Sequence, residues 1–132
     1  MGQQQLLLIV LGVIVVGIAV VVGINLFNAN AETSTQDSIV SQGTNIGALA
    51  QEYYKKPVSM GGGGNSFTNF NTKVWPNLPA NLTSSTDATW QITGTPSNTN
   101  CVFTATPKDA GYAANWTVIT TVTKDSITSV VQ

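Results

Sequence analysis

The stretch that decides the fold is MGQQQLLLIVLGVIVVGIAVVVGINLF, residues 1–27, in which three glutamines precede 22 residues without a single charge, positions 6–27. An α-helix rises about 1.5 Å per residue, so this run would be about 33 Å long and could cross a bilayer core of about 30 Å. The sequence therefore predicts an apolar helix that resides in a membrane at some stage.

Three roles fit this apolar helix to different degrees. A cleaved secretory signal needs a positively charged start, and a single-pass anchor normally carries basic residues on its cytoplasmic side, but the first lysine here is Lys55. The third role is a helix that leaves the bilayer and packs into the core of a polymer. Gly12, Ala19 and Gly23 fall within about 20° of one line along the helix, so a second helix could approach closely there. This stripe favours the polymer, although small residues are also common in membrane helices generally.

The hydrophobic helix is predicted to continue as an amphipathic helix. No proline lies in residues 28–56. Apolar residues in this part recur at intervals of three, four and seven, which marks one helical face. These residues are Ile39, Ile46, Ala50 and Tyr53, with Leu49 beside them.

The sequence also predicts where this helix ends. Pro57 forces the residue before it out of the helical region, so residues 1–56 are expected to form one N-terminal helix, about 80 Å long if unbroken. Gly43, Gly47 and the polar stretch 28–38 weaken this helix and are where a kink or a short non-helical segment would fall.

Residues 57–132 are predicted to form a β-rich globular domain. It begins with four glycines at 61–64, expected to act as a linker that is either a flexible joint or a close-packed loop, and an aromatic segment that should pack on a sheet. Four later segments are rich in β-branched and aromatic residues, as strands are; they are 88–93, 101–106, 115–123 and 126–131. The expected fold class is α+β, with the C-terminal half of the long helix packed against a small antiparallel sheet.

Composition excludes several classes of function. Only 8% of residues are charged and the formal net charge is -1, so no basic face is available to bind nucleic acid. The chain has no histidine and one cysteine, Cys101, and its six carboxylates are scattered. We therefore expect no catalytic, metal or cofactor site, and we interpret Cys101 as a small buried apolar residue. Asn81 and Asn115 begin triplets that match the glycosylation pattern, which also arises by chance in a chain rich in Asn and Thr.

This organisation resembles that of the type IV pilin superfamily, whose members have a short polar start, about twenty apolar residues, an amphipathic continuation of the same helix and a β-rich head. The likeness extends over the whole chain, and its specific signal lies in the first 55 residues or so. It implies a structural subunit that waits in the cytoplasmic membrane, is processed by a prepilin peptidase and is extracted by pilus assembly machinery. Many copies then pack their N-terminal helices into an extracellular, cell-surface filament. The alternative is a membrane-anchored module that binds a surface polymer, or a minor pseudopilin of a secretion system.

The polar start departs from the pilin pattern. If Met1 is the mature N-terminus, Gln5 stands where pilins commonly carry a glutamate that pairs with the N-terminal amine of a neighbouring subunit. An amide accepts a hydrogen bond from an ammonium group but cannot neutralise its charge. We therefore expect Gln3, Gln4 and Gln5 to satisfy the amine by hydrogen bonds, with the amine methylated, as in related pilins, or partly neutral.

Overall fold

The computed structural model describes residues 2–132, which form two units, residues 2–34 and Thr35–Gln132. The second unit is the head. Helix α1 (Gly2–Lys55) contributes its first part to one unit and its remainder to the head. The other elements follow in the order η1 (Val58–Met60), α2 (Phe70–Lys73), η2 (Trp75–Asn77), α3 (Ala80–Thr83), β1 (Ala88–Ile92), β2 (Asn100–Pro107), α4 (Ala110–Ala113), β3 (Val118–Thr123) and β4 (Ile127–Val131).

Helix α1 ends where the sequence predicts. Its last residue is Lys55, and Pro57 adopts an extended conformation with φ −61° and ψ 150°. No non-helical segment interrupts α1 at residues 28–38 or at its later glycines. The polar residues of that stretch weaken a helix only slightly one by one, and the chain contains no proline before Pro57 to break it.

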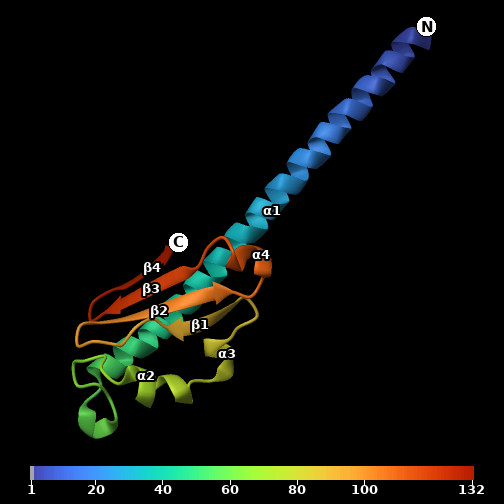
Figure 1. The fold of residues 1–132 in the computed structure, drawn as a ribbon. Coiled ribbons are helices and arrows are strands. Elements are labelled where there is room, and N and C mark those ends of the chain that lie inside the picture. Colours follow the sequence, from blue (N-terminus) through green and yellow to red (C-terminus); the bar gives the residue numbers. More distant parts are fainter. Residues whose placement is uncertain (1) are drawn as a thin grey trace. The chain divides into compact units, whose positions relative to one another are not determined.

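The four strands form one antiparallel sheet in the order β1-β2-β3-β4, as predicted (Figure 1). The register pairs Trp90 with Ala105, and Phe103 with Thr120. Alternate residues of β1, β2 and β3 are buried, while those between them are more exposed. The buried face of the sheet lies against the part of α1 that belongs to the head, which confirms the predicted α+β class.

The face of α1 toward the sheet is the one that the apolar spacing marks. Ile39, Ile46 and Ala50 have no exposed surface and Tyr53 has almost none. The same face contains Gly43 and Gly47, both buried. A Cβ atom on Gly43 would lie 2.5 Å from Thr120 Oγ1 and 2.7 Å from Trp90 Cη2. These glycines thus let the sheet approach the helix backbone, a role that their effect on helix propensity does not reveal.

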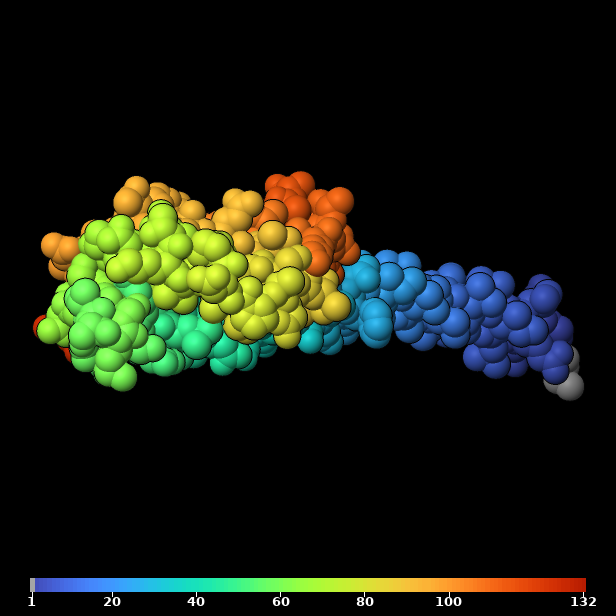
Figure 2. Space-filling view, turned by 90° about the horizontal axis from the view of Figure 1, so that it is seen from below, coloured from blue at the N-terminus to red at the C-terminus, as the bar shows by residue number. Residues whose placement is uncertain are grey.

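The aromatic segment after α1 packs as the sequence predicts. Phe67 and Phe70 are fully buried, and the Phe70 ring meets the Phe103 ring edge to face, with centroids 5.8 Å apart. Trp75 stacks on the same Phe103 ring at 5.4 Å. Figure 2 shows residues 57–87, coloured green to yellow, as a layer over one face of the head. This layer completes a core that the sheet and α1 alone would leave open.

The glycine stretch 61–64 forms a close-packed loop that closes the end of α1. Backbone N–H groups of Gly63 and Gly64 donate to the carbonyl oxygens of Tyr53 and Lys56, at 2.8 and 3.0 Å. Carbonyls in the last turn of a helix have no partner within it, and this loop supplies partners. A side chain at Gly63 would collide with the Ser66 carbonyl, so of the two roles expected for such a stretch, joint or packed loop, the structure has the second.

One predicted strand boundary is wrong. Residues 115–117 lie outside β3, which begins at Val118, because the preceding residues form α4. The Asp109 side chain caps this short helix by accepting a 2.8 Å hydrogen bond from the Gly111 N–H. The Trp116 ring stacks on Tyr112 with centroids 5.7 Å apart. Trp116 is therefore buried by a helical turn and not by a place in the sheet.

Candidate functional site

The strongest candidate site is the apolar surface of α1 within residues 6–27. Seventeen leucine, isoleucine, valine and phenylalanine side chains lie there, and every one is at least 51% exposed. Nothing else in the described part of the chain covers them. A helix that is apolar on all sides is found in the core of a large protein or in a membrane, so water is not the environment for which this surface is built.

Helix α1 is long and apolar enough to cross a membrane by length and composition. The same two properties also suit a helix buried among copies of itself, because both surroundings are dry. In either case the intrahelical hydrogen bonds satisfy the backbone without help from water. The length and composition of α1 thus suit a lipid bilayer and a bundle of apolar helices equally well, and do not distinguish between them.

The predicted assembly residues lie on this helix, except for Met1, which is outside the described residues. The glutamines Gln3, Gln4 and Gln5 are exposed in its first turns. Gly12, Ala19 and Gly23 are helical and exposed too, so they share one stripe as the sequence predicts. The described members of the predicted assembly set are Gln3, Gln4, Gln5, Gly12, Ala19 and Gly23. The stripe is open, because a Cβ added at Gly12 or Gly23 would meet no atom within 4 Å.

The two asparagines of the glycosylation triplets lie on the surface of the head. Asn81 is exposed in α3. Asn115 is exposed after α4, where its Nδ2 donates a 2.8 Å hydrogen bond to the Gly111 carbonyl. Both amides are therefore on the surface, and a glycosylated Asn115 would keep one Nδ2 hydrogen for that bond.

Cys101 is buried in β2, as predicted, with 1% of its surface exposed. Desolvation raises the pKa of its thiol to about 12, so the thiol is neutral at physiological pH. A nucleophilic cysteine needs the thiolate and access to solvent, and Cys101 has neither. Burial also raises the pKa of Tyr53, whose hydroxyl donates a 2.9 Å hydrogen bond to the Thr68 carbonyl.

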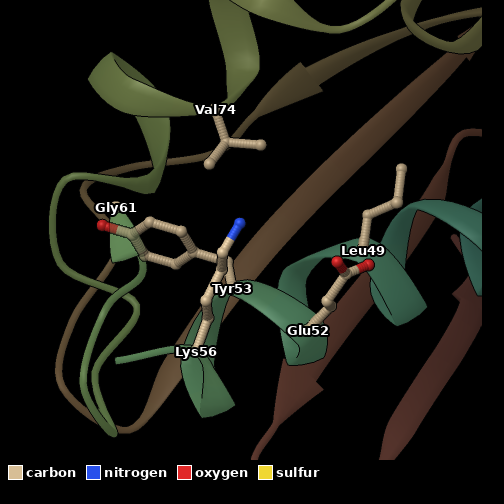
Figure 3. Close-up of a pocket in the computed structure, with 6 residues that line it drawn as sticks. All are labelled: Leu49, Glu52, Tyr53, Lys56, Gly61 and Val74. Atoms are coloured by element: carbon tan, nitrogen blue, oxygen red, sulfur yellow. The ribbon is translucent and has the colours of Figure 1, made fainter. Parts of the chain in front are cut away.

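Two hollows lie on the head. The first, of about 140 Å³, is drawn in Figure 3, where the Lys56 side chain runs beside the Tyr53 ring and Val74 lies across from them. The second, of about 350 Å³, is lined by Tyr54, Thr99, Thr123, Lys124 and Asp125. Both hollows are lined by charged and hydroxyl side chains, and the Lys124 and Asp125 side chains of the second form an exposed ion pair at 3.9 Å. Within the described residues, no three metal-ligating side chains gather in one place.

Comparison with known proteins adds no further guide to the site. No family model matches the chain, and neither a curated protein nor a solved structure does. The exposed apolar helix is therefore the feature that bears on function.

Proposed function

We propose that this chain is the structural subunit of an extracellular helical filament of the type IV pilus kind, with the apolar helices of neighbouring copies as its core. The observation that supports this proposal is the exposure of the seventeen apolar side chains within residues 6–27, each at least 51% exposed. Burying each of them is worth about 1.5–3 kcal/mol when complete. Even the exposed half of that surface makes a strong driving force for association, before the entropy of assembly is subtracted.

The open stripe of small residues supports helix contact over lipid contact. A lipid chain adapts to any side chain, whereas two helices approach closely only where small residues face each other. Gly12, Ala19 and Gly23 give such a stripe, and the rest of residues 6–27 are large apolar side chains apart from Gly17 and Asn25. On this proposal the subunit resides in the cytoplasmic membrane first, and prepilin peptidase and pilus assembly machinery are its partners there.

A second function, a membrane-anchored surface-binding module or minor pseudopilin, is compatible with the same helix. The length and apolar composition of α1 suit a membrane span without any polymer. In that case each copy would remain single in a bilayer, and the head would act alone.

Electron microscopy of the purified full chain separates the two functions. We expect removal of detergent to yield long thin filaments, and helical reconstruction to place residues 6–27 in the interior. A chain that instead enters lipid vesicles as a monomer, and forms no fibres even on cells that supply pilus assembly machinery, would refute the filament and favour the anchor. A variant lacking residues 2–27 serves as the control, and it should remain a soluble head under both hypotheses.

A further inference from the structure

The contacts between α1 and the sheet show which charged residues share an end of the head. Ser38 Oγ donates a 2.7 Å hydrogen bond to Asp87 Oδ2, just before β1, and Gln51 Nε2 donates a 3.0 Å bond to the carbonyl of Thr123, at the end of β3. The antiparallel register puts the start of β1 and the end of β3 at opposite ends of the sheet. The part of α1 within the head therefore runs along the strands, from the Asp87 end to the Thr123 end.

The Thr123 end carries most of the positive charge and is the basic end. Lys55 is the last residue of α1 and lies at this end, Lys56 follows it, and Lys124 follows β3. Lys73 belongs to the same end because its neighbour Val74 lines the hollow that Lys56 also lines (Figure 3). The basic end holds four lysines and two carboxylates, a formal charge of +2; they are Lys55, Lys56, Lys73, Lys124, Glu52 and Asp125.

The Asp87 end has the opposite sign and is the acidic end. Asp37 is exposed on α1 one residue before Ser38, and Asp109 lies after β2, whose Pro107 pairs with Ala88 of β1. Lys108 is the one lysine of the head that lies at this end. Three carboxylates and one lysine give a formal charge of −2; they are Asp37, Asp87, Asp109 and Lys108. The head as a whole is neutral, so its charges are separated along the strand direction.

Exposed aliphatic side chains gather at the same two ends. Val58 and Met60, in the η1 turn after Lys56, are 65% and 66% exposed. Val130 and Val131 are 49% and 39% exposed, and Val131 pairs with Val118 at the acidic end. Among the described residues of the head these are the large apolar side chains that stand out into solvent. Each end thus combines an apolar pair with a net charge, and the net charges of the two ends are opposite in sign.

We propose that the basic end of one head binds the acidic end of the head of a second copy. This inference rests on the proposed filament and names a contact between its subunits outside the helical core. The second copy is the occupant that fits, because one chain carries both complementary ends and a head-to-tail contact repeats without limit in a helical polymer. Opposite charges at the two ends would also fix the direction in which copies add, since like ends repel.

Reversing the charge at one end tests this contact. The variant Lys55→Glu with Lys56→Glu makes both ends of the head negative. The variant Asp37→Lys with Asp109→Asn makes both ends positive, and asparagine retains the helix cap that Asp109 provides. We expect each variant to need about tenfold more subunit than the wild type to form filaments, since several weak exposed pairs are replaced by repulsion.

Restored complementarity supplies the decisive comparison. A chain that carries all four substitutions has its ends exchanged, and we expect it to polymerise at the wild-type concentration. A mixture of the two one-end variants should copolymerise at a concentration at which neither forms filaments alone. The charge-keeping variant Lys55→Arg with Lys56→Arg should behave as the wild type, and the neutral variant Lys55→Gln with Lys56→Gln should fall between.

Near-ultraviolet circular dichroism of the head tryptophans must first show that each variant is folded. The end-to-end contact is refuted if folded one-end variants assemble as the wild type does. It is also refuted if the four-substitution chain assembles no better than the one-end variants. Neither outcome bears on the proposed filament itself. The contact is refuted as well if the variant Lys55→Glu with Lys56→Glu loses binding to anionic lipid vesicles while its filament yield is unchanged. That result would indicate that the basic end binds anionic surfaces. A wild-type chain that forms no filaments would refute the proposed function, and the end-to-end contact with it.

Discussion

Replacing Gly43 with alanine tests the packing that holds the head together. Alanine favours a helix over glycine by about 1 kcal/mol, so an open site would gain stability from this change. At Gly43 the new methyl group would instead lie 2.5 Å from Thr120 Oγ1 and 2.7 Å from Trp90 Cη2. Both neighbours are buried, and Thr120 is tied by a 2.9 Å hydrogen bond to Ser129. The helix and the sheet must therefore move apart.

The magnitude follows from those two opposing terms. Overpacking of a filled core costs about 1–3 kcal/mol, and two contacts this short with buried neighbours put Gly43 at the upper limit. After the gain in helix propensity, we expect a net loss of about 2 kcal/mol in the free energy of unfolding. For a unit the size of the head, that loss lowers Tm by about 10 °C.

Urea and thermal unfolding of the full chain in detergent micelles, followed by tryptophan fluorescence, measure this loss. Gly47→Ala is an informative comparison, because its methyl group would meet the side chain of Ile127 on the edge strand β4, which can turn aside. It should cost much less than Gly43→Ala. Asn45→Ala, exposed on the same stretch of α1, is the control and should not lower Tm. A Gly43→Ala protein as stable as the wild type would refute the close approach of helix and sheet.

Three further predictions concern the apolar helix and the head core. Gly12→Leu and Gly23→Leu should each reduce filament yield with the head still folded, because overpacking of about 1–3 kcal/mol is repeated in every subunit. Val21→Leu, on the opposite side of the helix, is the size control, and normal yields from both glycine variants in electron micrographs would show that the stripe is not a helix contact. Gln5→Ala should impair assembly by leaving a buried donor without a partner, at a cost of about 1–3 kcal/mol. Gln5→Glu should be tolerated if the N-terminal amine is charged and harmful if it is neutral. Equal filament yields from the wild type and these two variants would show that the position has no assembly role. The Cys101 pKa is raised from 9.0 to about 12 in the folded head, so its contribution to stability is complete below pH 9 and is lost as pH rises toward 12; Cys101→Ala should make urea unfolding less dependent on pH across that window, and an unchanged pH dependence would contradict the assignment.

The sequence predicts best those features that depend on local pattern. The apolar spacing of Ile39, Ile46 and Ala50 identifies the buried face of α1, because a helix must place residues three and four apart on one side. Pro57 fixes the end of α1 for a reason just as local. The uncharged apolar run at residues 6–27 likewise predicts a helix long enough to span a bilayer.

The features that the sequence does not reveal depend on residues far apart in the chain. Gly43 lowers helix propensity wherever it occurs, and only the positions of Trp90 and Thr120 show why a glycine is needed there. The segment 115–117 has the composition of a strand, but the cap at Asp109 starts a helical turn before it. The separation of charge into two ends is equally hidden, because it requires the strand register and the contacts of α1.

The division between residues 34 and 35 separates two kinds of apolar surface on one helix. From Thr35 onward, α1 buries Ile39, Ile46 and Ala50 completely against the head's own sheet. The head core therefore includes this part of α1, and a change on its buried face alters the folding of the head. Before residue 35 no large apolar side chain is buried in the described part of α1. Substitutions at residues 6–27 thus act on contacts with other molecules and leave the head core intact, so a loss of filaments caused by such a change can be assigned to assembly alone.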